Sequence, residues 1–178
     1  LHRLQRDPLL STVSPRDLPE RQQTMNATVA WSYQLLDPNT QRALRRLGAL
    51  PGRFSVDAAA AGIATDGRAS TDDGALDGLA ALIDKSLLLR AETAVPARPL
   101  YQMLETVRAY AALELIAAGE RDGALEGLAR YCVAEASLAA DGLVGTAQVE
   151  WLDRVRQDLE SYRAALTWLV DRDRPTEA

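Results

Sequence analysis

The chain has 178 residues with a formal net charge of −5, and 47% of the residues are hydrophobic and 25% charged. This composition is typical of a folded globular protein and excludes a disordered tail, and the acidic balance gives no general attraction to nucleic acid or to an anionic membrane. No apolar run approaches the roughly 20 residues of a membrane helix, and the single cysteine excludes an internal disulfide, so we expect a cytoplasmic protein.

Residues 1–20 are predicted to be the end of a preceding helical domain followed by a linker, because a leucine-rich start gives way to two prolines that favour an extended chain. Apolar residues then recur at helical spacing over 22–36, 38–47 and 56–63. Asp37 is a suitable N-cap and Pro38 a suitable first residue for the second helix. We expect a turn at 50–54.

A polar loop at 65–73 precedes a predicted helix over 74–83. Two short apolar runs, 87–90 and 100–103, then predict the strands of a hairpin around a proline-containing loop. Three helices followed by a hairpin is the order of a winged helix-turn-helix domain. Trp31 in the first helix is expected to pack in the core.

From residue 104 onward the pattern is helical, and it predicts helices over 104–118, 122–140 and 148–170. The last one carries apolar residues at alternating steps of three and four, together with Glu150, Arg154 and Asp158 spaced for ion pairs four residues apart. Its apolar face needs a partner helix, so we interpret this part as the start of a helical repeat array.

No catalytic residue is predicted. Cys132 and His2 are the only cysteine and histidine, too few for a zinc site, and Cys132 is expected to be inert core packing. Neither a GxxxxGK[ST] nor a GxGxxG motif occurs, so we expect no cofactor and no ATP hydrolysis in this segment. The sequence therefore indicates a non-enzymatic module.

Four blocks carry a resemblance to a known family. They are LPERQQT at 18–24, WSYQLL at 31–36, LIDKSLL at 82–88 and YQMLETVRAYA at 101–111. In this order they resemble one region of bacterial STAND regulators, which are NB-ARC-type ATPases found in actinobacterial transcription regulators and in some proteins with an adenylate cyclase domain. The resemblance spans about residues 18–170.

The resemblance implies a mainly α fold, with a winged helix-turn-helix domain and its β-hairpin wing at 21–118. The antiparallel helices of 119–178 would begin a TPR-like superhelix. It also implies a preceding nucleotide-binding core, so ATP and ADP are cofactors of the parent protein only. The family often has a Met-His-Asp motif after the wing; here the matching positions resemble Met103-Leu104-Glu105. Leu104 cannot donate the histidine's hydrogen bond, whereas Glu105 can stabilise a helix N-terminus.

The predicted function is a regulatory interaction module that couples the nucleotide state of the absent core to the helical array. Its partners would be that core and an effector or protein at the array. The expected inter-domain surface includes three arginines of the second helix and a lysine after the fourth: Arg42, Arg45, Arg46 and Lys85. We expect the three arginines to point partly outward.

The alternative function is a winged-helix DNA-binding domain of a transcription regulator. The charge of the helix that would read DNA argues against it, because residues 72–84 contain four aspartates and no lysine or arginine. We therefore do not expect this segment to bind DNA. DNA binding or cyclase activity of the parent protein is a separate question.

Overall fold

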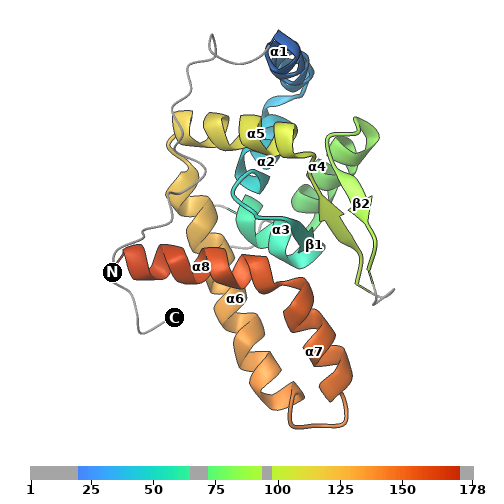
Figure 1. Ribbon diagram of the computed structural model, residues 1–178, viewed down its shortest axis with the longest axis vertical. Coiled ribbons are helices and arrows are strands. Elements are labelled where there is room, and N and C mark those ends of the chain that lie inside the picture. The colour runs from blue at the N-terminus through green and yellow to red at the C-terminus, as the bar shows by residue number, and fades with distance from the viewer. Residues whose placement is uncertain (1–19, 65–71, 94–97, 173–178) are drawn as a thin grey trace.

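A computed structural model of the chain describes residues 20–64, 72–93 and 98–172. In chain order, the elements are α1 (Glu20–Gln34), α2 (Pro38–Leu47), β1 (Arg53–Ser55), α3 (Val56–Ile63), α4 (Asp72–Asp84), β2 (Leu89–Ala91), β3 (Leu100–Gln102), α5 (Glu105–Ala117), α6 (Arg121–Gly142), α7 (Gln148–Gln157) and α8 (Leu159–Asp171). The fold is mainly α with a small antiparallel sheet, as the sequence predicts (Figure 1). Almost all of the predicted linker at 1–20 and most of the polar loop at 65–73 lie outside the described residues.

The start of α2 follows from its capping residues. The Asp37 carboxylate accepts hydrogen bonds from the backbone N–H groups of Asn39 and Thr40 at 3.0 and 3.1 Å. Pro38 occupies the first turn, where a missing N–H leaves no intrahelical bond unmade. The Thr40 hydroxyl also donates a hydrogen bond to the Asp37 carboxylate, at 2.6 Å. This bond, together with the one from the Thr40 backbone N–H, lowers the pKa of Asp37 below its ordinary value.

The sheet has three strands in the order β1-β3-β2, and both pairings are antiparallel. The two predicted strands form the β2–β3 hairpin. The expected turn at 50–54 is wrong in its second half, because Arg53 and Phe54 begin β1 and pair with β3. A three-residue strand is too short to show alternation, and only the buried Phe54 marks its inner face.

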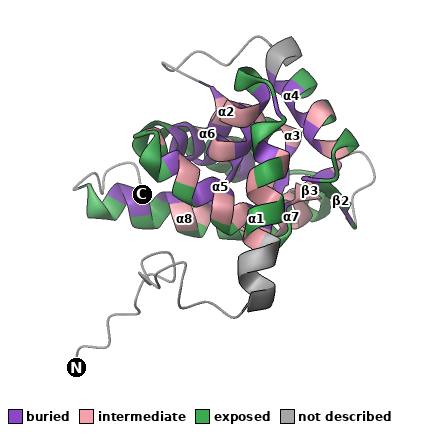
Figure 2. Cartoon of the chain, turned by 90° about the horizontal axis from the view of Figure 1, so that it is seen from above, coloured by how far each residue is buried: buried purple, intermediate pink, exposed green. Residues whose placement is uncertain are grey.

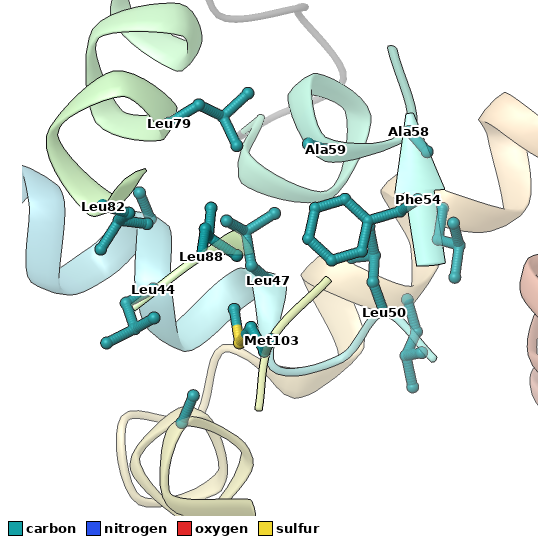
Figure 3. Packing of buried hydrophobic residues seen from close by; sticks show 14 of the residues in the cluster. Leu44, Leu47, Leu50, Phe54, Ala58, Ala59, Leu79, Leu82, Leu88 and Met103 are labelled. Atoms are coloured by element: carbon teal, nitrogen blue, oxygen red, sulfur yellow. The ribbon is translucent and has the colours of Figure 1, made fainter. Parts of the chain in front are cut away.

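The core of the winged helix forms where α2, α3, α4 and the sheet meet. Leu44, Leu47, Phe54, Leu82 and Leu88 are at most 1% exposed and point toward one another (Figure 3). Full burial of one such side chain contributes roughly 1.5–3 kcal/mol. The packing of these residues fixes the orientation of α4 relative to α2.

The helices α5, α6 and α8 continue the same cluster of buried side chains rather than starting a separate one. The helix α6 packs against α3, and α8 folds back across α6 (Figure 1). The approach of α6 to α3 is so close that a Cβ at Gly127 would meet the Ala61 carbonyl oxygen. A division of the chain near residue 118 stays a prediction.

Buried residues line the sides of α2, α5 and α6 that face the interior (Figure 2). Several residues of α1 are exposed to solvent. Tyr33 is buried in the core. Its ring lies edge-on to the ring of Tyr110, with 5.5 Å between the two ring centroids. The prediction that Trp31 packs in the core is wrong, because its side chain is 64% exposed. The two aromatics are two residues apart on a helix, so they point in different directions.

The predicted helix over 148–170 is in fact two helices, α7 and α8, which meet at Asp158. Arg154 and Asp158, which were expected to form ion pairs within this helix, have partners in other elements instead. Arg154 contacts Glu135 of α6 at 3.0 Å, and Asp158 contacts Arg98 at 2.5 Å. These tertiary partners explain why the chain bends at a residue that could continue a helix. Among the described residues, no helix is long and apolar enough to cross a membrane.

Candidate functional site: the surface of the winged helix

The helix α4 occupies the position of the recognition helix. The elements α2, β1, α3, α4, β2 and β3 follow one another as in a winged helix-turn-helix domain, whose last helix before the hairpin enters the DNA groove in DNA-binding members. Leu79 and Leu82 anchor the inner side of α4 in the core. A Cβ at Gly78 would lie 3.2 Å from the Ala43 side chain, which shows how closely α4 approaches α2.

The outer side of α4 is acidic and partly apolar. Leu76 is 45% exposed, and Asp77, Ala80 and Asp84 are exposed on the same helix. The sequence of 72–84 contains four aspartates in all and no basic residue. Electrostatic repulsion from phosphates opposes insertion of this surface into a DNA groove.

Lys85 follows α4 directly and its side chain is exposed at the turn toward β2. The next residue, Ser86, has a φ of 58°, so the chain turns sharply there. Its backbone N–H and that of Leu87 donate to carbonyls at the end of α4, at 2.8 and 2.9 Å. These hydrogen bonds fix the backbone of the turn, and Lys85 lies next to the exposed Asp84 at the end of α4.

Two of the three α2 arginines converge on one carboxylate. Arg45 donates to Glu120 at 2.8 Å and to the Tyr33 hydroxyl at 2.9 Å. The Arg42 Nε lies 3.9 Å from the other oxygen of Glu120. The pair ties α2 to the chain just before α6.

Arg46 points into the protein, contrary to the expectation of a partly outward side chain. It is 3% exposed and donates to the carbonyl oxygens of Gly62 and Ala64, both at 2.7 Å. A cation at the C-terminus of α3 satisfies carbonyls that the helix leaves unpaired and interacts favourably with the helix dipole. Periodicity alone could not reveal this, because a long basic side chain on a helix flank can point either way.

The residues Met103, Leu104 and Glu105 connect β3 to α5. Met103 is buried in the core, whereas Leu104 is 53% exposed and makes no side-chain capping bond. Glu105 lies in the first turn of α5 and forms a two-pronged ion pair with Arg108, at 2.6 and 3.1 Å. Nucleotide sensing at these positions stays a prediction.

A buried polar cluster, which sequence reasoning missed, joins the hairpin to the α7–α8 junction. Arg98 precedes β3 and donates to Asp158 at 2.5 Å and to the Tyr131 hydroxyl at 2.7 Å. The Ser55 hydroxyl lies 3.3 Å from both Arg98 and Tyr131. Arg98 and Asp158 are 60 residues apart, so no local pattern signals the pair.

No catalytic chemistry is evident in the geometry of the described residues. They contain no group of three or more His, Cys, Asp and Glu side chains arranged to hold a metal ion. Burial raises the pKa of the Cys132 thiol to about 12, so the thiol stays protonated at neutral pH and is a poor nucleophile.

Comparison with known proteins supports the topology. Residues 36–116 match a family described as the winged helix-turn-helix domain. The chain is also 33% identical over 166 residues to Rv0890c and MT0914 of Mycobacterium tuberculosis and Mb0914c of Mycobacterium bovis, all provisionally named HTH-type transcriptional regulators. The alignment covers 92% of the chain but 18% of each relative, so the chain spans less than a fifth of their length. No solved structure matches the chain.

The matched residues include every element from α2 to β3 and most of α5. The order of helices and strands, the antiparallel hairpin and the family match agree with one another. Residues 36–116 of this chain therefore form a winged helix-turn-helix domain.

Proposed function

We propose that this chain is the winged-helix regulatory module of a bacterial transcriptional regulator, and that its α4 surface contacts protein rather than DNA. The observation that carries the proposal is the charge of α4, which has four aspartates and no basic residue over 72–84, with Asp77 and Asp84 exposed. Non-specific DNA binding depends on lysines and arginines that neutralise phosphates. A surface without them, and with an exposed Leu76, is better suited to a protein partner.

The partner in this proposal is a nucleotide-binding core in the same protein, as the resemblance to STAND ATPases implies. ATP or ADP would bind that core, and the winged helix over 21–118 would transmit its state to helices beginning at 119. Leu104 and Glu105, which are exposed next to the buried Met103, would face the nucleotide-binding core. Arg42, Arg45 and Lys85 would belong to the same inter-domain surface. Such coupling requires that each ligand bind one of two domain arrangements better than the other. The module would act in the cytoplasm and catalyse no reaction itself.

Direct DNA binding is the second candidate function, although the acidic charge of α4 argues against it. It is favoured by the family match and by the names of the mycobacterial relatives. Exposed basic residues of the sheet are Arg53 on β1 and Arg90 on β2, which the strand register places on opposite faces. Binding through a hairpin rather than the recognition helix would leave the acidic α4 outside the groove.

Titration of the 178-residue chain against a labelled random duplex at low salt tests the proposal by fluorescence anisotropy. Because non-specific DNA-binding proteins have Kd values of about 10⁻⁴ to 10⁻⁶ M, we expect binding weaker than about 10⁻⁴ M. Saturable binding that weakens steeply with salt contradicts the proposal.

Two double variants of equal charge change distinguish the candidates within the same titration. If either face of the sheet binds DNA, Arg53→Ala/Arg90→Ala weakens binding, whereas Arg121→Ala/Arg130→Ala, at exposed positions of α6, leaves it nearly unchanged. Under the proposal, neither variant changes an already negligible signal.

A further inference from the structure

The buried cluster around Arg98 holds the two ends of the hairpin loop against the corner between α7 and α8. Arg98 binds Asp158 and Tyr131 at one end of the loop. At the other end, the Thr93 hydroxyl accepts a hydrogen bond from the Gln157 side-chain amide at 3.0 Å, and Gln157 in turn accepts one from Arg98 at 3.3 Å. Gln157 and Asp158, which are neighbours at the α7–α8 corner, therefore hold both ends of the hairpin loop.

The ion pair at the centre of this cluster is shielded from water. The side chains of Arg98 and Asp158 are 10% and 1% exposed. Burial is the largest single influence and lowers the pKa of Arg98, but the hydrogen bond to Asp158 and the attraction of nearby acidic groups together outweigh it and raise that pKa above its ordinary value. The arginine therefore stays charged, and separating it from Asp158 without water entering leaves an unpaired buried charge.

The cluster is not optimised for stability. Two of its buried polar atoms have no hydrogen-bond partner among the described residues: Arg98 Nε and Asp158 Oδ1. A buried charge pair with unmet hydrogen bonds gains little over apolar packing of the same size, so its role is positional rather than stabilising. Water that enters on opening satisfies these atoms, which lowers the free energy of the open state.

The strands of the hairpin make few contacts with α7 and α8. A cleft of about 490 Å³ lies between them, lined by residues that include Arg53, Glu92 and Asp153. Leu100 of β3 also lines this cleft, whereas Leu88, just before β2, packs in the core cluster. The polar side chains are therefore the main link between the hairpin and the α7–α8 corner, while β3 stays paired with β1.

We propose that Arg98, Asp158, Tyr131 and Gln157 form a latch that couples the wing to the α7–α8 corner, and that the structure represents its closed state. Displacement of the corner withdraws Asp158 and Gln157 together and releases both ends of the hairpin loop. Anything that binds α7 or α8 in the displaced position thereby frees the wing, and a partner that captures the free wing displaces the corner. The latch proposal is independent of the proposed function: it holds whether the partner of the winged helix is protein or DNA.

Hydrogen exchange on the unmodified chain provides the first test. If the latch opens as a unit, the amides of β2 and β3 and of the second turn of α8, whose N–H groups are hydrogen-bonded within the helix, exchange through a common opening, well before those of α2 in the core. Independent exchange of the hairpin and of α8 overturns the proposal, as does exchange of all these segments only on global unfolding.

Two substitutions provide the second test. Arg98→Met keeps the length of the side chain and removes its charge, and Asp158→Asn keeps the shape of its partner. Each is expected to speed exchange in the hairpin by at least about tenfold, the effect of losing a hydrogen bond to a charged group, with α2 unchanged. The matched control is Arg163→Met, which breaks an exposed ion pair with Glu160 on α8 and leaves hairpin exchange unchanged. Equal acceleration in α2 and the hairpin, or none in the hairpin, contradicts the latch.

Discussion

Burial determines the chemistry of Cys132, which lies on α6 at 4% exposure. Its pKa is raised from an ordinary 9.0 to about 12, mainly by desolvation of the thiolate. Tyr162, across the same interface on α8, has its pKa raised from 10.0 to about 12 for the same reason. Both groups are neutral when protonated, so ionisation favours the unfolded chain.

We predict that iodoacetamide labels Cys132 at pH 8 only slowly in the folded chain and rapidly in urea. The sign of the pH effect follows from the raised pKa values: their contribution to stability is complete below pH 9 and is lost progressively between about pH 9 and about pH 12. Mass spectrometry after timed labelling measures the first effect, and urea midpoints at increasing pH measure the second. Rapid labelling of the folded chain at pH 8 would show that the thiol is accessible.

The sequence predicted the environment of some individual side chains but not of others. The inert packing of Cys132 was predictable, because a lone apolar-face cysteine is most often buried. The exposed Trp31 and the inward Arg46 were not, since each side chain's direction depends on which helix packs beside it. Asp158 looked like an ordinary member of an exposed ion-pair series until Arg98 was brought to it by the fold.

At the scale of elements, close helix crossings depend on glycines. Gly48 ends α2 where that helix crosses α5, and a Cβ built on it lies 2.8 Å from the backbone atoms Ala111 C and Ala112 N. Backbone atoms cannot move aside as a side-chain end can. The α2–α5 contact therefore requires glycine at this position.

We predict that Gly48→Ala lowers the free energy of unfolding by about 1–3 kcal/mol, the usual penalty of overpacking. The control is Gly123→Ala in α6, where the nearest atom to the new Cβ is the flexible Arg46 Nη1 at 3.6 Å. Since alanine favours helix over glycine, this control is expected to be neutral or to stabilise by up to about 1 kcal/mol. Urea denaturation of both variants measures the difference, and equal stabilities would refute the crossing argument.

The element boundaries show what periodicity can and cannot predict. The ranges of α2 and α3 follow from the sequence because each has a clear cap, Asp37 and Ser55. The strand β1 was missed because three residues give no alternation, and its pairing with β3 is a long-range contact. The break between α7 and α8 was missed for a related reason: the partner that stabilises Asp158 comes from the hairpin.

For the whole molecule, the winged-helix topology could be predicted from the order of helices and hairpin strands. The acidic character of α4 was also evident from sequence, since it depends on composition rather than on contacts. The structure adds which α4 residues face outward and the continuity of the core from α2 through α6 to α8. It also shows the contacts of the proposed latch, which join three segments distant in the chain and therefore leave no local pattern.

The central claim is that α4 presents a protein-binding surface within a helix-turn-helix fold. The most direct measurement is hydrogen exchange of the 178-residue chain at low salt, with and without an excess of duplex DNA. The account predicts that amides of residues 76–84 exchange at the same rate in both samples. Protection by DNA that is concentrated on α4 and the adjoining hairpin would contradict the account and assign α4 to DNA recognition.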